Sequence, residues 1–143
     1  MDRKRKTAVL CAVILLISVF LAGCSTGTEE TITIGKDLIP TLYSVVGHRT
    51  RTGTSTATEN GTVTKSVTYA GLTKEDVQSY IDALAADGYI QTEGTKVDGN
   101  AQSLQIAIES STEGKVILID IAFDPQSSTT LTYTVTDGTL TRE

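Results

Sequence analysis

Side chains suited to acid–base or nucleophilic chemistry are scarce in this chain of 143 residues, which has one histidine, His48, and two cysteines, Cys11 and Cys24. A Ser-His-Asp relay would have to use His48, and a metal site built from several histidines is excluded. His48 lies in a polar stretch with no local partner to orient its ring, so we interpret it as an ordinary exposed histidine. Glycine-rich phosphate loops, nucleophile elbows, HExxH and CxxC motifs are absent. We expect no cofactor and no metal.

Carboxylates offer a second kind of chemistry. Asp120 lies inside the most apolar segment, 115–123, and Asp124 directly follows it. An unpaired carboxylate buried there would be costly, so we expect both to face solvent. The alternative is a paired-carboxylate hydrolase, whose second member would come from Asp98, Glu109 or Glu113. Calcium binding at 98–100 is disfavoured, because Asp-Gly-Asn lacks the alternating oxygen ligands of a calcium loop and is typical of a hairpin turn.

A small basic patch stands out in a mostly acidic chain. It consists of His48, Arg49 and Arg51, next to a Thr-rich segment. Such a patch could bind an anionic partner, although isolated arginines usually pair with nearby carboxylates. We retain it as a candidate binding patch.

The amino-terminal segment has the pattern of an export signal. Four basic residues at positions 3–6 precede a charge-free apolar run from Ala8 to Ala22, which is shorter than the ~20 residues needed to span a bilayer. The run ends in Leu21-Ala22-Gly23-Cys24, which resembles the lipobox of bacterial lipoproteins. The resemblance implies that Leu21, Ala22 and Gly23 form the cleavage motif and that Cys24 carries the acyl chains as the new first residue.

Cleavage after residue 23 would leave 120 residues with eight Lys and Arg against 16 Asp and Glu, a net charge of −8. This balance disfavours binding to nucleic acid or to anionic headgroups. The protein would then attach to its membrane partner through the lipid alone, and two or three acyl chains are enough for stable anchoring. We expect a lipid-anchored location on the extracytoplasmic face of the cell membrane.

The remaining chain is rich in Thr, Val, Ile and Tyr, which favour strands. Patterning predicts a strand over 41–52, a loop or an exposed hairpin end over 51–60 that is closed by Asn60-Gly61, a strand over 62–70 and further strands over 89–93, 103–109, 115–123 and 131–135. Segment 115–123 is apolar on both sides, which predicts a central strand. The strongest local signal is a helix that begins after Thr73, with Asp76 completing a capping box, and ends at Gly88. Its apolar stripe is Val77, Tyr80, Ile81, Leu84 and Ala85.

These elements predict an α+β fold, in which one helix packs on one face of a curved antiparallel sheet of about five to six strands, in the order ββαββββ. We divide the chain into a signal peptide (1–23), a lipidated cysteine with a flexible tether (24–36) and a single α+β domain (37–143). The segment 72–89, with its Tyr80, Leu84 and Gly88-Tyr89 spacing, resembles uncharacterised small lipoproteins of low-GC Gram-positive bacteria. That resemblance implies no catalytic residues.

The sequence therefore favours a non-enzymatic lipoprotein that binds or scaffolds an envelope protein or cell-wall polymer, through a concave sheet face or an edge strand. The alternative is an envelope hydrolase, or a hydrolase accessory, that uses carboxylates alone. Two carboxylates sharing a cleft would favour the hydrolase, whereas a Thr-lined sheet face would favour binding.

Overall fold

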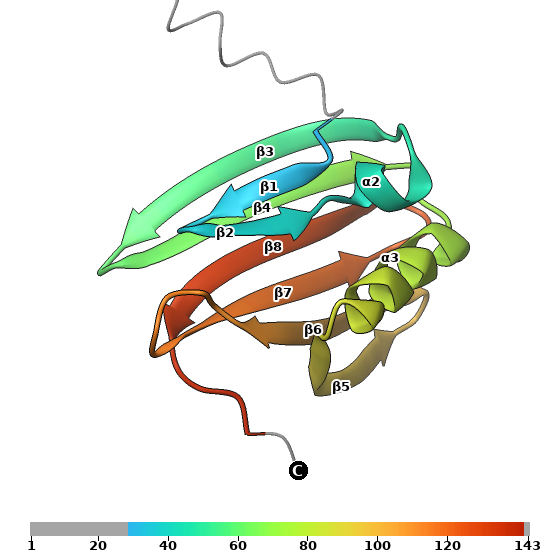
Figure 1. Ribbon diagram of the computed structural model, residues 1–143. Helices are drawn as coiled ribbons and strands as arrows, with labels where there is room; N and C mark the ends of the chain where they lie inside the picture. The colour runs from blue at the N-terminus through green and yellow to red at the C-terminus, as the bar shows by residue number, and fades with distance from the viewer. Residues whose placement is uncertain (1–28, 142–143) are drawn as a thin grey trace, which may run out of the picture.

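The computed structural model describes residues 29–141, and these build a six-stranded antiparallel sheet in the order β3-β4-β8-β7-β6-β5 together with a small β1-β2 sheet (Figure 1). The strands are β1 (Thr31–Ile34), β2 (Asp37–Pro40), β3 (Thr50–Glu59), β4 (Thr62–Ala70), β5 (Ile90–Asp98), β6 (Ala101–Glu109), β7 (Lys115–Phe123) and β8 (Ser128–Asp137). The described helices are α2 (Leu42–Val46) and α3 (Lys74–Ala86). β7 and β8 occupy the middle of the large sheet, which confirms the prediction of 115–123 as a central strand.

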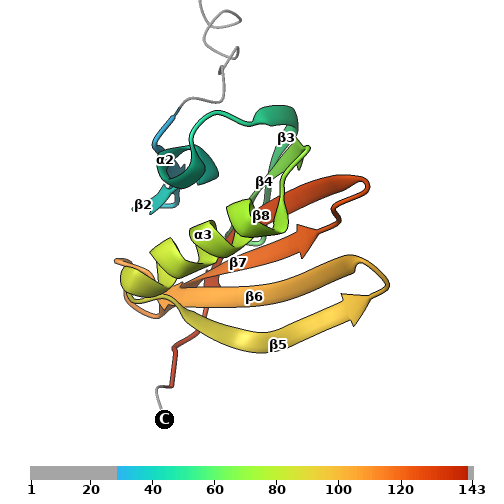
Figure 2. The same ribbon diagram turned by 90° about the vertical axis from the view of Figure 1, so that its right-hand side faces the viewer.

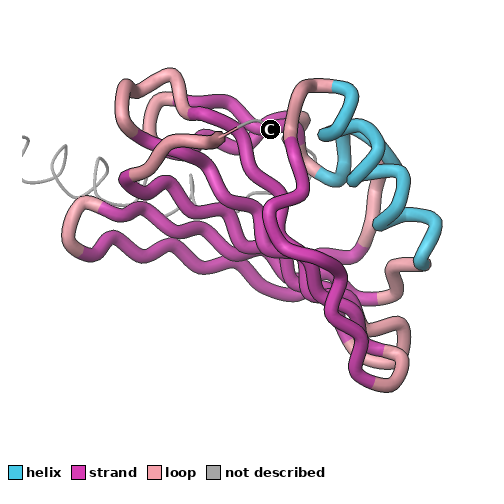
Figure 3. The backbone as a smooth tube through the Cα atoms, turned by 90° about the horizontal axis from the view of Figure 1, so that it is seen from below, coloured by secondary structure: helices cyan, strands magenta, loops and turns pink. Residues whose placement is uncertain are grey.

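Both helices and the β1-β2 hairpin lie on the same face of the large sheet (Figures 1 and 2), and Figure 3 shows the helices on one side of the strands. Two polar contacts fix the hairpin there. Lys65 of β4 donates to the carbonyl of Thr33 at 2.6 Å. Asp37 accepts hydrogen bonds from the Ser110 hydroxyl and the Ser111 amide in the β6–β7 turn. The opposite face of the large sheet, which we call the open face, carries no helix in the described chain.

Helix α3 forms for the local reasons visible in the sequence. The Thr73 hydroxyl accepts from the Asp76 amide at 3.1 Å, and the Asp76 carboxylate accepts from the Thr73 amide at 3.2 Å, which makes a capping box. The helix ends before Gly88, whose φ of 96° suits a residue without Cβ. Of the predicted apolar stripe, Val77, Tyr80 and Leu84 are buried and Ile81 is partly buried, whereas Ala85 is exposed.

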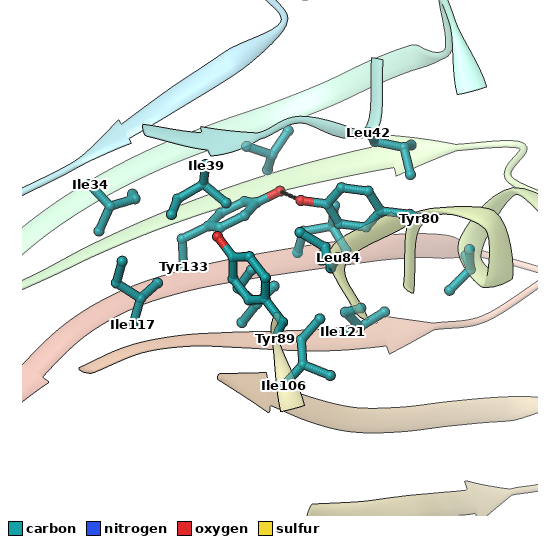
Figure 4. Packing of buried hydrophobic residues seen from close by; sticks show 14 of the residues in the cluster. Ile34, Ile39, Leu42, Tyr80, Leu84, Tyr89, Ile106, Ile117, Ile121 and Tyr133 are labelled. Atoms are coloured by element: carbon teal, nitrogen blue, oxygen red, sulfur yellow. Dashed lines mark hydrogen bonds between the residues drawn. The ribbon is translucent and has the colours of Figure 1, made fainter. Parts of the chain in front are cut away.

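The core lies between the large sheet and this covering layer (Figure 4). Tyr80 of α3 and Tyr133 of β8 meet at its centre, and their hydroxyls are 2.8 Å apart. The Tyr80 hydroxyl donates to the carbonyl of Pro40 at 2.7 Å, which links helix, sheet and hairpin in one chain of hydrogen bonds. Since Tyr80 has a single hydroxyl proton, Tyr133 must be the donor between the two tyrosines.

The predicted fold class is wrong. The structure is predominantly β, with a separate two-stranded sheet in addition to the six-stranded one, and its order is ββαββαββββ instead of ββαββββ. Helix α2 was not foreseen, and α3 covers only part of one face.

Three local errors explain this difference. Residues 31–34 were assigned to the tether, yet they pair with β2, because Ile34 and Ile39 are both buried in the core. Residues 42–46 were assigned to a strand, but Thr41 caps a helical turn that buries Leu42. Residues 51–60 were predicted as a loop or an exposed hairpin end; the Asn60-Gly61 turn is confirmed, and the error is one of extent, since the whole segment pairs with β4 as β3.

The cleavage motif Leu21-Ala22-Gly23 and the lipidation residue Cys24 lie outside the described residues, as does the signal peptide. Among residues 29–141, neither helix is long and apolar enough to cross a membrane.

Candidate binding face

The basic patch predicted at the start of β3 is dominated by ion pairs. Arg49 holds Asp76 with two hydrogen bonds, of 3.0 Å from Nε and 2.7 Å from Nη2. The guanidinium of Arg49 lowers the pKa of the Asp76 carboxyl, with the Thr73 amide helping. Arg51 lies 3.5 Å from the carboxylate of Glu29, and His48 is exposed. Both arginines thus balance carboxylates, and Arg49 also supports the start of α3.

The open face is lined by hydroxyl groups where β4 and β8 meet. Three cross-strand pairs of hydroxyls are hydrogen-bonded, at 3.2 to 3.4 Å, and together we call them the hydroxyl ladder: Thr64 with Thr134, Ser66 with Thr132, and Thr68 with Thr130. These residues alternate with Val67, Tyr69, Leu131 and Tyr133, which are buried beneath α3 and the hairpin. Alternation therefore forces the ladder onto the open face.

Asp120 extends this polar surface across the neighbouring strands. It stands opposite Thr132 of β8 and opposite Gln105 of β6. The Gln105 amide donates to Asp120 at 2.9 Å, and the Gln105 carbonyl oxygen accepts from Thr92 at 2.8 Å. The carboxylate thus lies in a hydrogen-bonded row on the open face, opposite α3, as the alternation predicts.

At one end of the open face the surface is hollowed. The hollow has a volume of about 390 Å³, within the range of ligand pockets. Its lining comes from the tip of the β5–β6 hairpin and from the end of β7 with the β7–β8 turn. The polar residues are Lys96, Asp98, Gln102, Ser103, Asp124, Ser127, Ser128 and Thr130, and the apolar ones are Val97, Ala101, Ala122 and Phe123.

The hollow forms because the strand register places a small side chain between its two neighbours. Ser103, Ala122 and Thr130 lie side by side on β6, β7 and β8. Ala122, the smallest of the three side chains, is exposed and sits in the middle of this row. Thr130 belongs both to the hollow and to the hydroxyl ladder, so the two features form one continuous surface.

The structure brings together two of the carboxylates considered for a paired site. Asp98 and Asp124 line the same hollow, whereas Asp120, Glu109 and Glu113 do not line it. Asp124 also accepts from the Gln126 amide at 2.9 Å, which holds the β7–β8 turn. Lys96 is 2.9 Å from Glu93, and this contact raises the pKa of its ammonium group. No group of three or more potential metal ligands occurs within residues 29–141.

Sequence reasoning missed Lys96, Ser127, Ser128 and Ala122. Nothing local marks these residues, because the hollow exists only when two distant turns meet. The ladder had a visible signal in the alternating threonines of 62–68 and 130–134, but the pairing of these segments is a tertiary feature.

The fold and the site of residues 29–141 define a class of protein: an antiparallel β protein with helices and a hairpin on one face of its large sheet and a hollowed, hydroxyl-bearing surface on the other. No protein-family model matches the chain, and comparisons with curated proteins and with solved structures find no match.

Proposed function

We propose that this protein is a membrane-anchored extracytoplasmic lipoprotein, and that its open face is a non-enzymatic binding surface for a hydroxyl-rich, uncharged polymer such as a cell-wall glycan. The observation that carries the binding proposal is the continuous surface formed by the hydroxyl ladder and the hollow. Threonine and serine hydroxyls both donate and accept, as sugar hydroxyls do, and the carboxylates of Asp98 and Asp124 accept further hydrogen bonds. The acidic balance of the chain argues against a polyanionic ligand.

Support for the anchor comes from Leu21-Ala22-Gly23-Cys24, and the first described residues suit such a tether. The carbonyls of Glu29 and Glu30 accept from the side chain and the amide of Thr41. Five residue steps separate Cys24 from Glu29, and they span at most about 18 Å. The anchor would therefore hold the domain close to the membrane.

The place where the amino-terminal tether joins the domain also leaves the open face available for binding. Glu29 pairs with Arg51, which stands opposite the buried Tyr69 and so lies on the face that carries α3. The anchor would thus approach from the helical side, with the open face on the other side of the sheet, available to the cell wall.

Two experiments test this proposal. Mass spectrometry of the protein from its native membranes should show a chain that begins at Cys24 and carries acyl groups. An intact leader, or a chain that begins elsewhere without acylation, would contradict the anchor.

Binding is tested with the full chain in detergent and a panel of neutral β-linked N-acetylglucosamine oligomers. Ala122→Phe fills the hollow from an exposed strand position and should abolish binding. Ala86→Phe is the matched control, since Ala86 is also exposed but lies on α3, on the other side of the sheet. Asp98→Asn and Asp124→Asn should each weaken binding about tenfold, the loss expected for a hydrogen bond to a charged group.

The outcomes separate the candidate functions. Equal binding by Ala122→Phe and the parent chain would exclude the hollow as the site. Cleavage of the oligomers by the parent chain, lost in Asp98→Asn or Asp124→Asn, would replace binding by the carboxylate hydrolase.

A further inference from the structure

The two edges of the large sheet differ in how they resist pairing with another strand. The β5 edge has two breaks in register, at Gln91/Glu93 and Glu93/Lys96, and charged side chains at both breaks. The β3 edge has neither device over residues 53–58, which pair with β4 in unbroken register. Residues 52–58 contain no charge and no proline, and they are all exposed. Long, uncharged edges with unpaired main-chain groups are templates for strand addition.

The hairpin geometry identifies the backbone groups that this edge offers. Asn60 and Gly61 have φ values of 50° and 78°, which fit a type I′ two-residue turn. Such a turn makes Glu59 and Thr62 a hydrogen-bonded pair, and bonding then alternates along the strands. The amides and carbonyls of Thr54, Thr56 and Thr58 therefore point away from β4, and β4 is the only strand beside β3 in the described chain.

We propose that β3 pairs antiparallel with β3 of a second copy of this chain, about a two-fold axis at Thr56, to give a continuous twelve-stranded sheet. The position of the axis follows from the two ends of the regularly paired segment of β3. The bulge between Arg51 and Gly53 limits it at one end and the turn after Glu59 limits it at the other, and the midpoint of 53–59 is Thr56. Thr56 is also one of the three residues whose backbone faces outward.

This register is self-complementary. Thr56 faces the partner's Thr56, and Thr54 faces the partner's Thr58, which gives six main-chain hydrogen bonds across the axis. Cross-strand threonine pairs of this kind are favourable. On the open face, Ser55 faces the partner's Ala57 and Gly53 faces the partner's Glu59. No like charges are opposed in this register.

The place where the amino-terminal segment joins the domain is compatible with this two-fold symmetry. The axis runs perpendicular to the sheet, so both copies present their helical faces on one side. Glu29 of each copy lies on that side through its ion pair with Arg51. Two anchored copies could therefore reach one membrane, and the two open faces would form a single extended surface.

Single cysteines test the pairing and its register. Opposed residues in a hydrogen-bonded antiparallel pair have Cα atoms about 5.5 Å apart, a distance that a disulfide bridges. Thr56→Cys should therefore form disulfide-linked dimers when membranes containing the full chain are oxidised with copper–phenanthroline. Thr58→Cys is the matched control: it lies on the same strand and face, but the two copies of residue 58 would be about 13 Å apart.

We expect at least about ten times more cross-linked dimer from Thr56→Cys than from Thr58→Cys, because only the first pair lies within disulfide reach. The parent chain, with Cys11 and Cys24, sets the baseline. Equal cross-linking of the two variants, or none from Thr56→Cys, would overturn the proposal.

A second variant tests the interface without a cross-link. Thr56→Pro removes an outward amide and leaves the ladder with β4 intact, as proline at an edge position allows. Sedimentation of the detergent-solubilised chain should show a dimer for the parent and for Thr56→Val, and a monomer for Thr56→Pro. A monomeric parent chain would refute the dimer, while glycan binding at the hollow would be unaffected.

Discussion

Replacing Tyr80 by phenylalanine is expected to cost more stability than the same change at Tyr133, although both tyrosines are buried and share one hydrogen bond. The Tyr80 hydroxyl donates to Pro40, so Tyr133 must donate to Tyr80. The two hydroxyls therefore have different roles. Tyr133 ends the chain of hydrogen bonds, whereas Tyr80 is its middle link.

The magnitudes follow from counting the bonds. Tyr133→Phe removes one hydrogen bond and leaves no donor unpaired, which should cost about 1 kcal/mol of unfolding free energy. Tyr80→Phe removes two hydrogen bonds and leaves the Tyr133 hydroxyl buried without its acceptor, so the cost should be about 3 kcal/mol or more. The double variant loses the same two bonds but has no stranded hydroxyl, and it should cost only about 2 kcal/mol.

The effect of Tyr133→Phe on the free energy of unfolding therefore changes sign between the two backgrounds. Tyr133→Phe should destabilise the parent chain by about 1 kcal/mol and should stabilise the Tyr80→Phe variant by about 1 kcal/mol. Urea unfolding followed by far-UV circular dichroism measures this, since a difference of that size moves the midpoint by about 0.3 to 1 M. If Tyr133→Phe destabilises both backgrounds by the same amount, the donor order deduced from the structure is wrong.

Three further predictions concern the polar contacts around the core. Asp76→Ala removes both the capping box and the partner of Arg49, and it should cost about 1 to 2 kcal/mol in urea unfolding. Because the pKa of Asp76 is lowered in the fold, its contribution is present above about pH 4 and lost as the pH falls further, so an acid titration of Asp76→Asn should show a shallower loss of stability than the parent. Burial alone would raise the pKa of Asp37, but hydrogen bonds from Ser110 and its neighbour lower it; Asp37→Ala should release the β1-β2 hairpin and increase its amide hydrogen exchange. Burial raises the pKa of Tyr89 to about 12, so stability should fall as the pH rises from about 10, where unfolded tyrosine ionises, towards 12, and Tyr89→Phe should flatten that decline.

The sequence was most informative where the signals are local. Helix α3 was predicted correctly because Thr73, Asp76 and Gly88 mark its ends through contacts within one turn of the chain. Helix α2 was predicted as a strand because Val45 and Val46 favour strands, and the burial of Leu42 outweighs that preference.

β3 was predicted as a loop or an exposed hairpin end, so its turn was predicted correctly but its full length as a strand was not. Its polar residues carry no hydrophobic pattern, and only the tight turn after Glu59, with the presence of β4 beside it, makes them a strand. The candidate site shows the same limit. The alternation in 130–134 indicated a polar face, but Asp98 and Asp124 share a hollow only because the β5–β6 and β7–β8 turns meet at one end of the sheet.

The sequence by itself determined the acidic charge, the scarcity of catalytic side chains, helix α3 and the Leu21-Ala22-Gly23-Cys24 motif, since each depends on composition or on neighbouring residues. Only the tertiary structure decided which strands are neighbours. β8 inserts between β4 and β7, so that Ser66 meets Thr132 across 66 positions of the chain. Pairing over such a distance depends on how the whole core closes, and no short segment encodes it.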